Sequence, residues 1–299
     1  MYRIGHVSDL HVLSHTGAQW RAMLFNKRIT GYANLLLHRA RVHRREYLQA
    51  VLAEVSKDAD HVVVTGDITN LALDHEYEDA QSLLDDVARS VEVTVVPGNH
   101  DIYLPAVFHE QRFTHYFAQF LRSDLPEFST DGYPCVKLRG PVAIVAISSG
   151  VPRPPFVAAG RVGEHQLEHL AKIFAHREVA RRTPVILIHH PLVDDRSRFA
   201  QLHDGLVDGA ALRNILEPLA RGLVLFGHIH IRVRCKLGNL DVVSASGAAL
   251  DHPDPNVRAG FNHYDIHDDG SIGSIDAYAL DASGRSFQRV EIAERAGCV

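Results

Sequence analysis

The sequence predicts an α/β protein in which short buried strands alternate with amphipathic helices. Short apolar runs end at polar residues, and segments with apolar side chains at helical spacing follow them. Because such alternating elements pack as layers around a sheet, we expect an α/β layered fold. The chain has 299 residues, of which 46% are apolar and 22% charged, and this is enough to bury a full core.

Five segments are predicted to be strands. All are short and apolar, and the last four are rich in β-branched residues, which is typical of strands buried in a sheet. Each gives way to polar side chains at its end. The segments are residues 2–7, 61–65, 91–96, 184–188 and 222–226.

Three segments carry apolar residues on one helical face, and we expect these faces to cover the core. Asp208 precedes the third segment and is predicted as its N-cap, because a carboxylate can accept hydrogen bonds from the first turn of a helix. The apolar faces are Leu48, Val51, Leu52 and Val55; Leu83, Leu84 and Val87; and Leu212, Ile215, Leu216 and Leu219.

The chain from about residue 231 onward is predicted to be β-rich. Strand patterns at 241–246, 261–267 and 287–292 are separated by Gly or Asp turns. We expect them to form a second sheet that closes the core. Because no linker and no repeat divides the chain, residues 1–299 are predicted to be a single domain.

One early segment differs in composition from the rest. No acidic residue occurs from Leu10 to Arg45, where basic side chains alternate with aromatic and aliphatic ones. This pattern predicts a basic, amphipathic helical insertion at about residues 16–45. Four of its arginines are candidates to face a substrate or a membrane surface, namely Arg39, Arg41, Arg44 and Arg45.

Charge and composition argue against several classes of protein. A net charge of −5 does not suit a surface built throughout for nucleic acid. The start of the chain lacks the features of a secretion signal, and no apolar run reaches membrane-spanning length. The three cysteines are widely spaced without a CxxC pair, so neither a disulfide framework nor a zinc knuckle is expected. These features predict a cytoplasmic protein.

Side chains that can bind metal follow the predicted strands. Asp9 and His11 follow the first strand, where alternation along a strand would point both side chains to the same side. Asp67 follows the second strand, behind a glycine that permits a tight turn, and a carboxylate there can bridge two ions. Because ligand sites in α/β folds form at the carboxyl ends of strands, we expect these residues to meet at one edge.

The remaining strands end in an amide and several imidazoles. Asn99 offers an amide oxygen, and the adjacent His100 can transfer protons without binding metal. Oxygen and nitrogen ligands without a thiolate suit Mn, Fe, Zn or Co. Each motif alone is more often a turn or a hydrogen-bonded pair, so the prediction depends on all five occurring in order at strand ends. The last two strands are followed by His189 and His190, and by His228 and His230.

In this order, the Asp-x-His, Gly-Asp, Gly-Asn-His-Asp, His and Gly-His-x-His motifs between Asp9 and His230 resemble the calcineurin-like metallophosphoesterase superfamily. Two of the motifs are most similar to class III cyclic nucleotide phosphodiesterases and related bacterial phosphodiesterases. The resemblance implies a four-layer α-β-β-α sandwich, with two packed mixed sheets flanked by helices. It also implies two metal ions, with manganese and iron favoured.

The resemblance further implies a role for each motif residue. A hydroxide that bridges the two ions would attack phosphorus, and His100 would protonate the leaving oxygen. His189 is preferred to His190 as a ligand because the family's ligand directly follows the apolar strand, which leaves His190 to support a ligand or face the substrate. Asp101 would either orient His100 or stabilise the turn. One ion would be held by Asp9, His11, Asp67 and His230, and the other by Asp67, Asn99, His189 and His228.

The motifs favour a small phosphodiester, such as a cyclic nucleotide, as the substrate. The basic insertion keeps an alternative open, a lipid-linked pyrophosphate hydrolase of the lipid A pathway type acting on UDP-diacylglucosamine, with peripheral membrane contact through residues 16–45. The basic insertion could instead have a purely structural role, as a solvated helical hairpin that covers the edge of the site. A nuclease ranks third because the chain is acidic overall, so no obligate nucleic-acid partner is expected. A non-enzymatic scaffold is disfavoured because no ligand is missing. The sequence does not fix the oligomeric state, for which a homodimer is one option.

Overall fold

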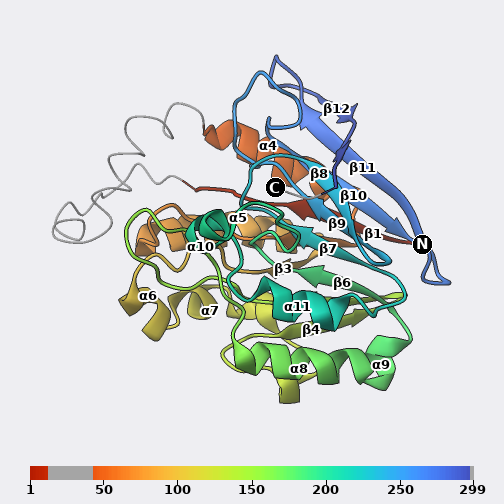
Figure 1. Ribbon diagram of the computed structural model, residues 1–299. Coiled ribbons are helices and arrows are strands. Elements are labelled where there is room, and N and C mark those ends of the chain that lie inside the picture. The colour runs from red at the N-terminus through yellow and green to blue at the C-terminus, as the bar shows by residue number, and fades with distance from the viewer. Residues whose placement is uncertain (13–42, 297–299) are drawn as a thin grey trace.

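The computed structural model describes residues 1–12 and 43–296, which form two mixed β-sheets flanked by helices (Figure 1). The first sheet has six strands in the order β12-β11-β10-β1-β2-β3, and the second has seven in the order β13-β8-β9-β7-β6-β5-β4. The predicted α/β fold with two packed mixed sheets is therefore confirmed.

The strands that lead to the predicted ligands run parallel within each sheet. In the first sheet β1, β2 and β3 are parallel to one another, and β10 pairs with β1 in the antiparallel direction. In the second sheet β5, β6, β7 and β9 are parallel. The first sheet consists of β1 (Tyr2–Val7), β2 (His61–Val64), β3 (Glu92–Val95), β10 (Gly260–Ile266), β11 (Ile272–Leu280) and β12 (Phe287–Val290). The second consists of β4 (Cys135–Arg139), β5 (Val142–Ala146), β6 (Thr183–Leu187), β7 (Gly222–Phe226), β8 (Val233–Leu237), β9 (Leu240–Ser244) and β13 (Ala293–Glu294).

Helices cover the outer faces of both sheets. Contacts join α4 to β1 and β10 and α5 to β3, so these two helices cover the first sheet. In Figure 1, α8, α9 and α11 lie together along the outer side of the second sheet. Within the described residues, the α-helices are α4 (Arg45–Val55), α5 (Asp74–Ala88), α6 (Pro105–His109), α7 (Arg112–Tyr116), α8 (Glu164–Ala175), α9 (Arg177–Ala180), α10 (Arg198–Asp204) and α11 (Gly209–Leu216), and the 3-10 helices are η2 (Ala118–Leu121) and η3 (Pro126–Phe128).

Alternate residues of one strand show how the layers pack. On β5, Val142 and Ile144 belong to an apolar cluster that also contains side chains of β1 and β2. Their neighbours Ala143 and Val145 belong to a second cluster, with side chains of α8 and α11. Because successive side chains of a strand point to opposite faces, one face of the second sheet packs on the first sheet and the other packs on helices.

The three predicted helical faces are directed into these cores. Helix α4 buries all of its predicted apolar face, α5 buries Leu84 and Val87, and α11 buries Leu212 and Leu216. Asp208 stands at the N-cap position of α11, but its carboxylate does not cap that helix. It accepts hydrogen bonds from the N–H groups of Val162 and Gly163, 3.0 and 2.8 Å away, and so ties the start of α8 to α11.

Three further expectations need correction or limits. The C-terminal strands do not form a sheet of their own, because β10, β11 and β12 extend the first sheet whereas β8, β9 and β13 extend the second. No disulfide framework was expected from the cysteine spacing; Cys135 is a free, buried thiol, but Cys235 is disulfide-bonded. The predicted insertion lies outside the described residues up to residue 42. Among the helices that the structure describes, none is long and apolar enough to cross a membrane.

Candidate metal centre

The predicted ligands lie in the loops that follow β1, β2, β3, β6 and β7. Asp9 and His11 follow β1, Asp67 follows β2, and Asn99 follows β3, all in the first sheet. His189 follows β6, and His228 and His230 follow β7, in the second sheet. The ligands therefore come from the ends of two sheets and not from one sheet edge, yet their side chains converge.

The first group consists of Asp9, His11, Asp67 and His230, whose ligand atoms all lie within 4.8 Å of one another. His230 Nε2 is 3.0 Å from Asp9 Oδ1 and 3.3 Å from His11 Nε2. Two atoms bound to one ion at about 2.1 Å lie about 3.0 to 3.4 Å apart when the angle between them is about 90 to 110°. The spacing of this group therefore fits a shared ion.

The second group brings together three side-chain atoms that act as acceptors. Asn99 Oδ1 lies 3.3 Å from His189 Nε2 and 3.1 Å from His228 Nδ1, and the two ring nitrogens are 3.2 Å apart. His189 donates through Nδ1 to the Thr65 carbonyl at 2.7 Å, and His228 donates through Nε2 to the Asp204 carbonyl at 2.8 Å. In neutral rings the nitrogens that face Asn99 are then lone pairs. Three converging lone pairs call for a cation between them.

Asp67 stands between the two groups. Its Oδ1 is 3.5 Å from His189 Nε2, and its Oδ2 is 4.0 Å from His11 Nε2. The side chain of Asp67 is almost fully buried. One oxygen thus faces each group, which is the arrangement that a bridging carboxylate requires.

The carboxylates and imidazoles of the site stabilise each other's charged forms. Burial opposes ionisation of Asp67, but the His189 and His100 imidazoles outweigh burial and hold the pKa of Asp67 well below its usual range. Burial likewise opposes ionisation of Asp9, whose pKa His230 nevertheless lowers. For His189, burial would lower the pKa, but Asp67 raises it to about 9. A proton on His189 therefore supplies the positive charge among these acceptors when no ion is bound.

His100 lies at the rim of the two groups. Its Nδ1 is 2.7 Å from the Asn70 carbonyl, to which it donates, and its Nε2 is 4.0 Å from Asp67 Oδ2. The ring stacks on Tyr103 with 5.7 Å between ring centroids. The Asn70 carbonyl and the Tyr103 ring thus fix the orientation of the imidazole, and its second nitrogen is directed toward the site.

Asp101 contacts the backbone of two loops and not the ring of His100. Its carboxylate accepts hydrogen bonds from the N–H groups of Gly98, Ile68 and Thr69, at 2.9, 3.1 and 2.7 Å. Burial, followed by the nearby Asp67 carboxylate, raises the pKa of Asp101 to about 7. The loops after β2 and β3 are therefore joined through this side chain, and the hydrogen bond that orients His100 comes from Asn70.

His190 has one ring nitrogen within 4.8 Å of nitrogens of His189 and His228, but both of its ring nitrogens are hydrogen-bonded elsewhere. Its Nδ1 is 2.8 Å from Ser149 Oγ, and its Nε2 is 2.8 Å from the Ala158 carbonyl. Burial and the neighbouring His228 imidazole lower the pKa of His190 well below its usual range. A neutral ring with both nitrogens hydrogen-bonded supports the loop beside His189, and the structure places His189 alone of this pair against Asn99.

The two described arginines of the predicted basic segment pair with carboxylates of the chain itself. Arg44 Nε donates to Asp251 Oδ2 at 2.7 Å, and Arg45 lies 3.6 Å from Asp79. Both guanidinium groups are about half exposed, at 47%. Arg39 and Arg41 lie outside the described residues.

The backbone of the ligand loops is bent in an unusual way. Asp9, His11, Asp67, His228 and His230 all have φ between 43° and 69°, the left-handed region that residues other than Gly, Asn and Asp rarely adopt. Because Asp9 and His11 lie beyond the end of β1, strand alternation does not explain why their side chains converge. The loop conformation explains this convergence.

Glycines in the same motifs permit a close approach of these loops. A Cβ atom on Gly98 would lie 2.1 Å from Asp67 Oδ1, and one on Gly227 would lie 1.9 Å from Ser8 Oγ. Neither position has room for a side chain. The Gly-Asn-His-Asp and Gly-His-x-His motifs therefore require glycine on steric grounds.

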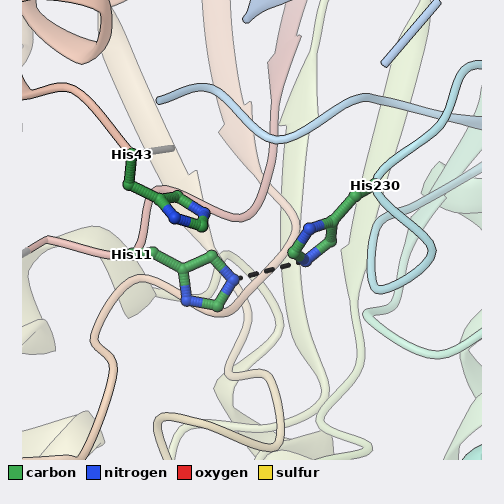
Figure 2. A group of neighbouring side chains, drawn as sticks. All are labelled: His11, His43 and His230. Atoms are coloured by element: carbon green, nitrogen blue, oxygen red, sulfur yellow. Dashed lines mark hydrogen bonds between the residues drawn. The ribbon is translucent and has the colours of Figure 1, made fainter. Parts of the chain in front are cut away.

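Sequence reasoning missed one imidazole and three carbonyl groups. His43 packs against His11 and lies near His230 (Figure 2). The carbonyls of Thr65, Asn70 and Asp204 accept from the site histidines. His43 stands among arginines outside every motif and so gave no clear sequence signal, and the carbonyls carry none because every residue has one.

An α-β-β-α sandwich whose strand ends bring carboxylate, amide and imidazole ligands together defines the class of two-metal hydrolases. Within this class, the chain belongs to the calcineurin-like phosphoesterase family, whose sequence model matches residues 2–232. The chain is accordingly a metal-dependent phosphoester hydrolase.

Similar proteins agree with this family. The chain is 24% identical over 221 residues to a probable cyclic nucleotide phosphodiesterase of Ruthia magnifica subsp. Calyptogena magnifica, covering 73% of this chain and 82% of that protein. It is 25% identical over 222 residues to a protein of the same description from Rhodococcus erythropolis, covering 72% and 65%.

Solved structures share the fold at low identity. A dimetal phosphatase from Danio rerio matches with a TM-score of 0.55 at 15% identity, covering 88% of this chain and 92% of that one. A purple acid phosphatase from yellow lupin matches with a TM-score of 0.63 at 12% identity, covering 98% and 54%.

Proposed function

We propose that this protein is a phosphodiesterase with two metal ions, which hydrolyses a small phosphodiester such as a cyclic nucleotide. The observation that carries the proposal is the convergence of Asn99 Oδ1, His189 Nε2 and His228 Nδ1, which all lie within 3.3 Å of one another. Asp67 then links this group to Asp9, His11 and His230. Manganese and iron are the proposed ions, as the family resemblance favours them.

The side chains divide the chemistry among them. Bound ions in such a pair lower the pKa of water and neutralise phosphoryl oxygens. Asp67 keeps both of its oxygens ionised and aimed at the two groups because its pKa is held low. Because Nδ1–H of His100 is committed to the Asn70 carbonyl, the proton for the leaving oxygen would come from Nε2 of the doubly protonated imidazolium, and the ring would be left neutral.

The proposal of a small substrate is supported by a cavity beside the loop that carries Asn99. This cavity has a volume of about 440 Å³ and is bounded by Pro97, Ile102 and Gly150 together with polar side chains that include Gln111 and Gln166. Its volume lies in the range of small-ligand sites. We propose that it receives the organic part of the diester, in agreement with the relatives described as probable cyclic nucleotide phosphodiesterases.

The test of the metal chemistry is Asp67→Ala, assayed with an aryl phosphodiester in manganese. We expect turnover to fall by about 1,000-fold or more, equivalent to about 4 kcal/mol of activation free energy. Asp58→Ala is the matched control, because Asp58 is an exposed aspartate just before β2, at the end of that strand remote from Asp67. Equal rates in Asp67→Ala and the wild type would refute the proposal.

The substrate is tested on one preparation with cyclic nucleotides, aryl phosphodiesters, aryl phosphomonoesters and UDP-diacylglucosamine. We expect diesters to be hydrolysed faster than monoesters and the pyrophosphate. Preference for the lipid-linked pyrophosphate, together with flotation on liposomes that is lost when Arg39, Arg41, Arg44 and Arg45 are neutralised, would favour the membrane-associated alternative. Metal binding without turnover of any of these would favour a scaffold.

A further inference from the structure

His43 is an imidazole beside the candidate metal centre that none of the recognised motifs contains. It is buried, with 8% of its surface exposed, and lies just before α4. Its backbone forms an isolated antiparallel bridge with Leu250. The next residue, Arg44, donates from its backbone N–H to the Ala249 carbonyl at 2.8 Å and from Nε to Asp251 at 2.7 Å. The loop at 249–251 thus fixes the position from which His43 extends.

The ring of His43 completes a cluster of three histidines (Figure 2). It meets the ring of His11 edge to face, with centroids 5.0 Å apart and planes at 75°, and its centroid is 6.4 Å from that of His230. One ligand nitrogen of each of the three rings lies within 4.8 Å of those of the other two. His11 and His230 therefore belong both to this cluster and to the group with Asp9 and Asp67.

His43 therefore lies beside two of the residues that are proposed to hold the first ion. Two ligands on opposite sides of one ion, each bound at about 2.1 Å, lie about 4.2 Å apart. The 4.8 Å limit joins His43 to His11 and His230 but does not join it to Asp9 and Asp67, so the nitrogen of His43 must move toward the carboxylates to bind the same ion. We propose that His43 is a fifth protein ligand of the ion held by Asp9, His11, Asp67 and His230. This inference rests on the metal centre of the proposed function.

A fifth ligand makes the two halves of the centre unequal. The first half then has three imidazoles and two carboxylates, whereas the half at Asn99 has two imidazoles, one carboxylate and one amide. More imidazole favours Zn, Fe and Co over Mg. Four protein ligands at Asn99 leave more positions open than five do, so the Asn99 half is the one that receives a substrate oxygen.

The decisive experiment measures metal binding and not turnover. Wild type, His43→Ala and His43→Phe are stripped of metal and titrated with Co²⁺ and Zn²⁺ against a chromophoric chelator, and the visible spectrum of bound Co²⁺ is recorded. The Phe variant keeps a ring against His11 but has no lone pair. His263→Ala is the matched control, because His263 is similarly buried, at 7%, and lies on β10.

We expect wild type and His263→Ala to bind two ions. Both His43 variants should bind one of the two at least about tenfold more weakly and show an altered Co²⁺ spectrum, with the other ion unchanged. Free imidazole should restore affinity and spectrum to His43→Ala, because it can enter the space and supply the nitrogen. A merely structural role for the ring would not be rescued in this way.

Three outcomes separate failure of this inference from failure of the proposed function. Unchanged affinities and spectra in both His43 variants overturn the inference and leave the two-metal centre intact. Weakened binding in His43→Ala that imidazole does not restore, together with normal binding in His43→Phe, also overturns it, because the ring then only packs against His11. A wild type that binds no ion contradicts the proposed function itself.

Discussion

Metal binding at the Asn99 half of the centre should be strongly dependent on pH because of one histidine. In the metal-free protein Asp67 raises the pKa of His189 to about 9, so His189 carries a proton at neutral pH. An ion needs the lone pair of Nε2, which places the proton and the ion in competition. His228, in contrast, has its pKa lowered to about 4, chiefly by burial and then by His189, and has no proton to lose near neutrality.

The magnitude follows from the single competing proton. Below a pKa of about 9, each unit of pH changes the apparent affinity tenfold, which corresponds to about 1.36 kcal/mol. Raising the pH from 6.5 to 8.0 should therefore tighten binding by about 30-fold, with the slope levelling only as the pH approaches 9. About one proton should be released for each ion bound at this half.

Isothermal titration calorimetry checks both numbers. Titrating Mn²⁺ into metal-free protein at several pH values gives the affinity, and repeating each titration in buffers of different ionisation enthalpy gives the number of protons released. His189→Gln should show weaker binding without this proton release. An affinity that does not change between pH 6.5 and 8.0, with no proton released, would show that His189 is neutral in the metal-free protein and refute the reasoning.

Three other predictions concern stability and local geometry. Acidification from pH 7 to 5 should lower the free energy of unfolding of the metal-free protein by about 2 kcal/mol for each of His6 and His61, whose pKa burial holds at about 3 in the fold against 6.5 in the unfolded chain. As the pH falls below 6.5, the unfolded chain protonates these two histidines while the folded protein does not, so stability is lost from pH 6.5 downward. Equal urea midpoints at pH 7 and 5 would contradict this prediction. Gly98→Ala should weaken metal binding at least about tenfold, because the new Cβ meets the Asp67 carboxylate, while the circular dichroism spectrum stays unchanged. Gly209→Ala is the control and should bind metal normally, because a Cβ at this position in the first turn of α11 makes only ordinary contacts. Free ion at 100 times its Kd should stabilise the native state by about 2.7 kcal/mol, so removing it with a chelator should lower the melting temperature by at least about 5 °C. An unfolding curve that is the same with and without chelator would exclude metal binding to the native state.

The sequence predicted the fold class because its signals are local. Apolar runs and helical faces identified the strands that precede the ligands, and α4 buries each residue of its predicted face. The pairing of distant strands is not local, so the division of the C-terminal strands between two sheets was not foreseen. For the same reason the ligands were expected at one sheet edge, although they come from the ends of two sheets.

The identity of the clustered residues was predictable, but the geometry behind it was not. Asp9 and His11 were expected to share a side through strand alternation, whereas left-handed φ angles of 52° and 43° direct them. Hydrogen bonds from backbone N–H groups to Asp101 depend on two loops meeting in space. His43 lies within the predicted basic segment and in none of the motifs, so spacing along the chain gave no sign that it lies beside His11.

The division of the ligands between two sheets also sets the order in which the protein can mature. Each candidate ion takes ligands from both sheets, and those of the first half extend from Asp9 to His230 along the chain. A nascent chain that has emerged only as far as His100 carries the ligands of the first sheet but none of the imidazoles of the second. In the proposed centre, a complete ligand set for either ion would therefore form only after both sheets have docked.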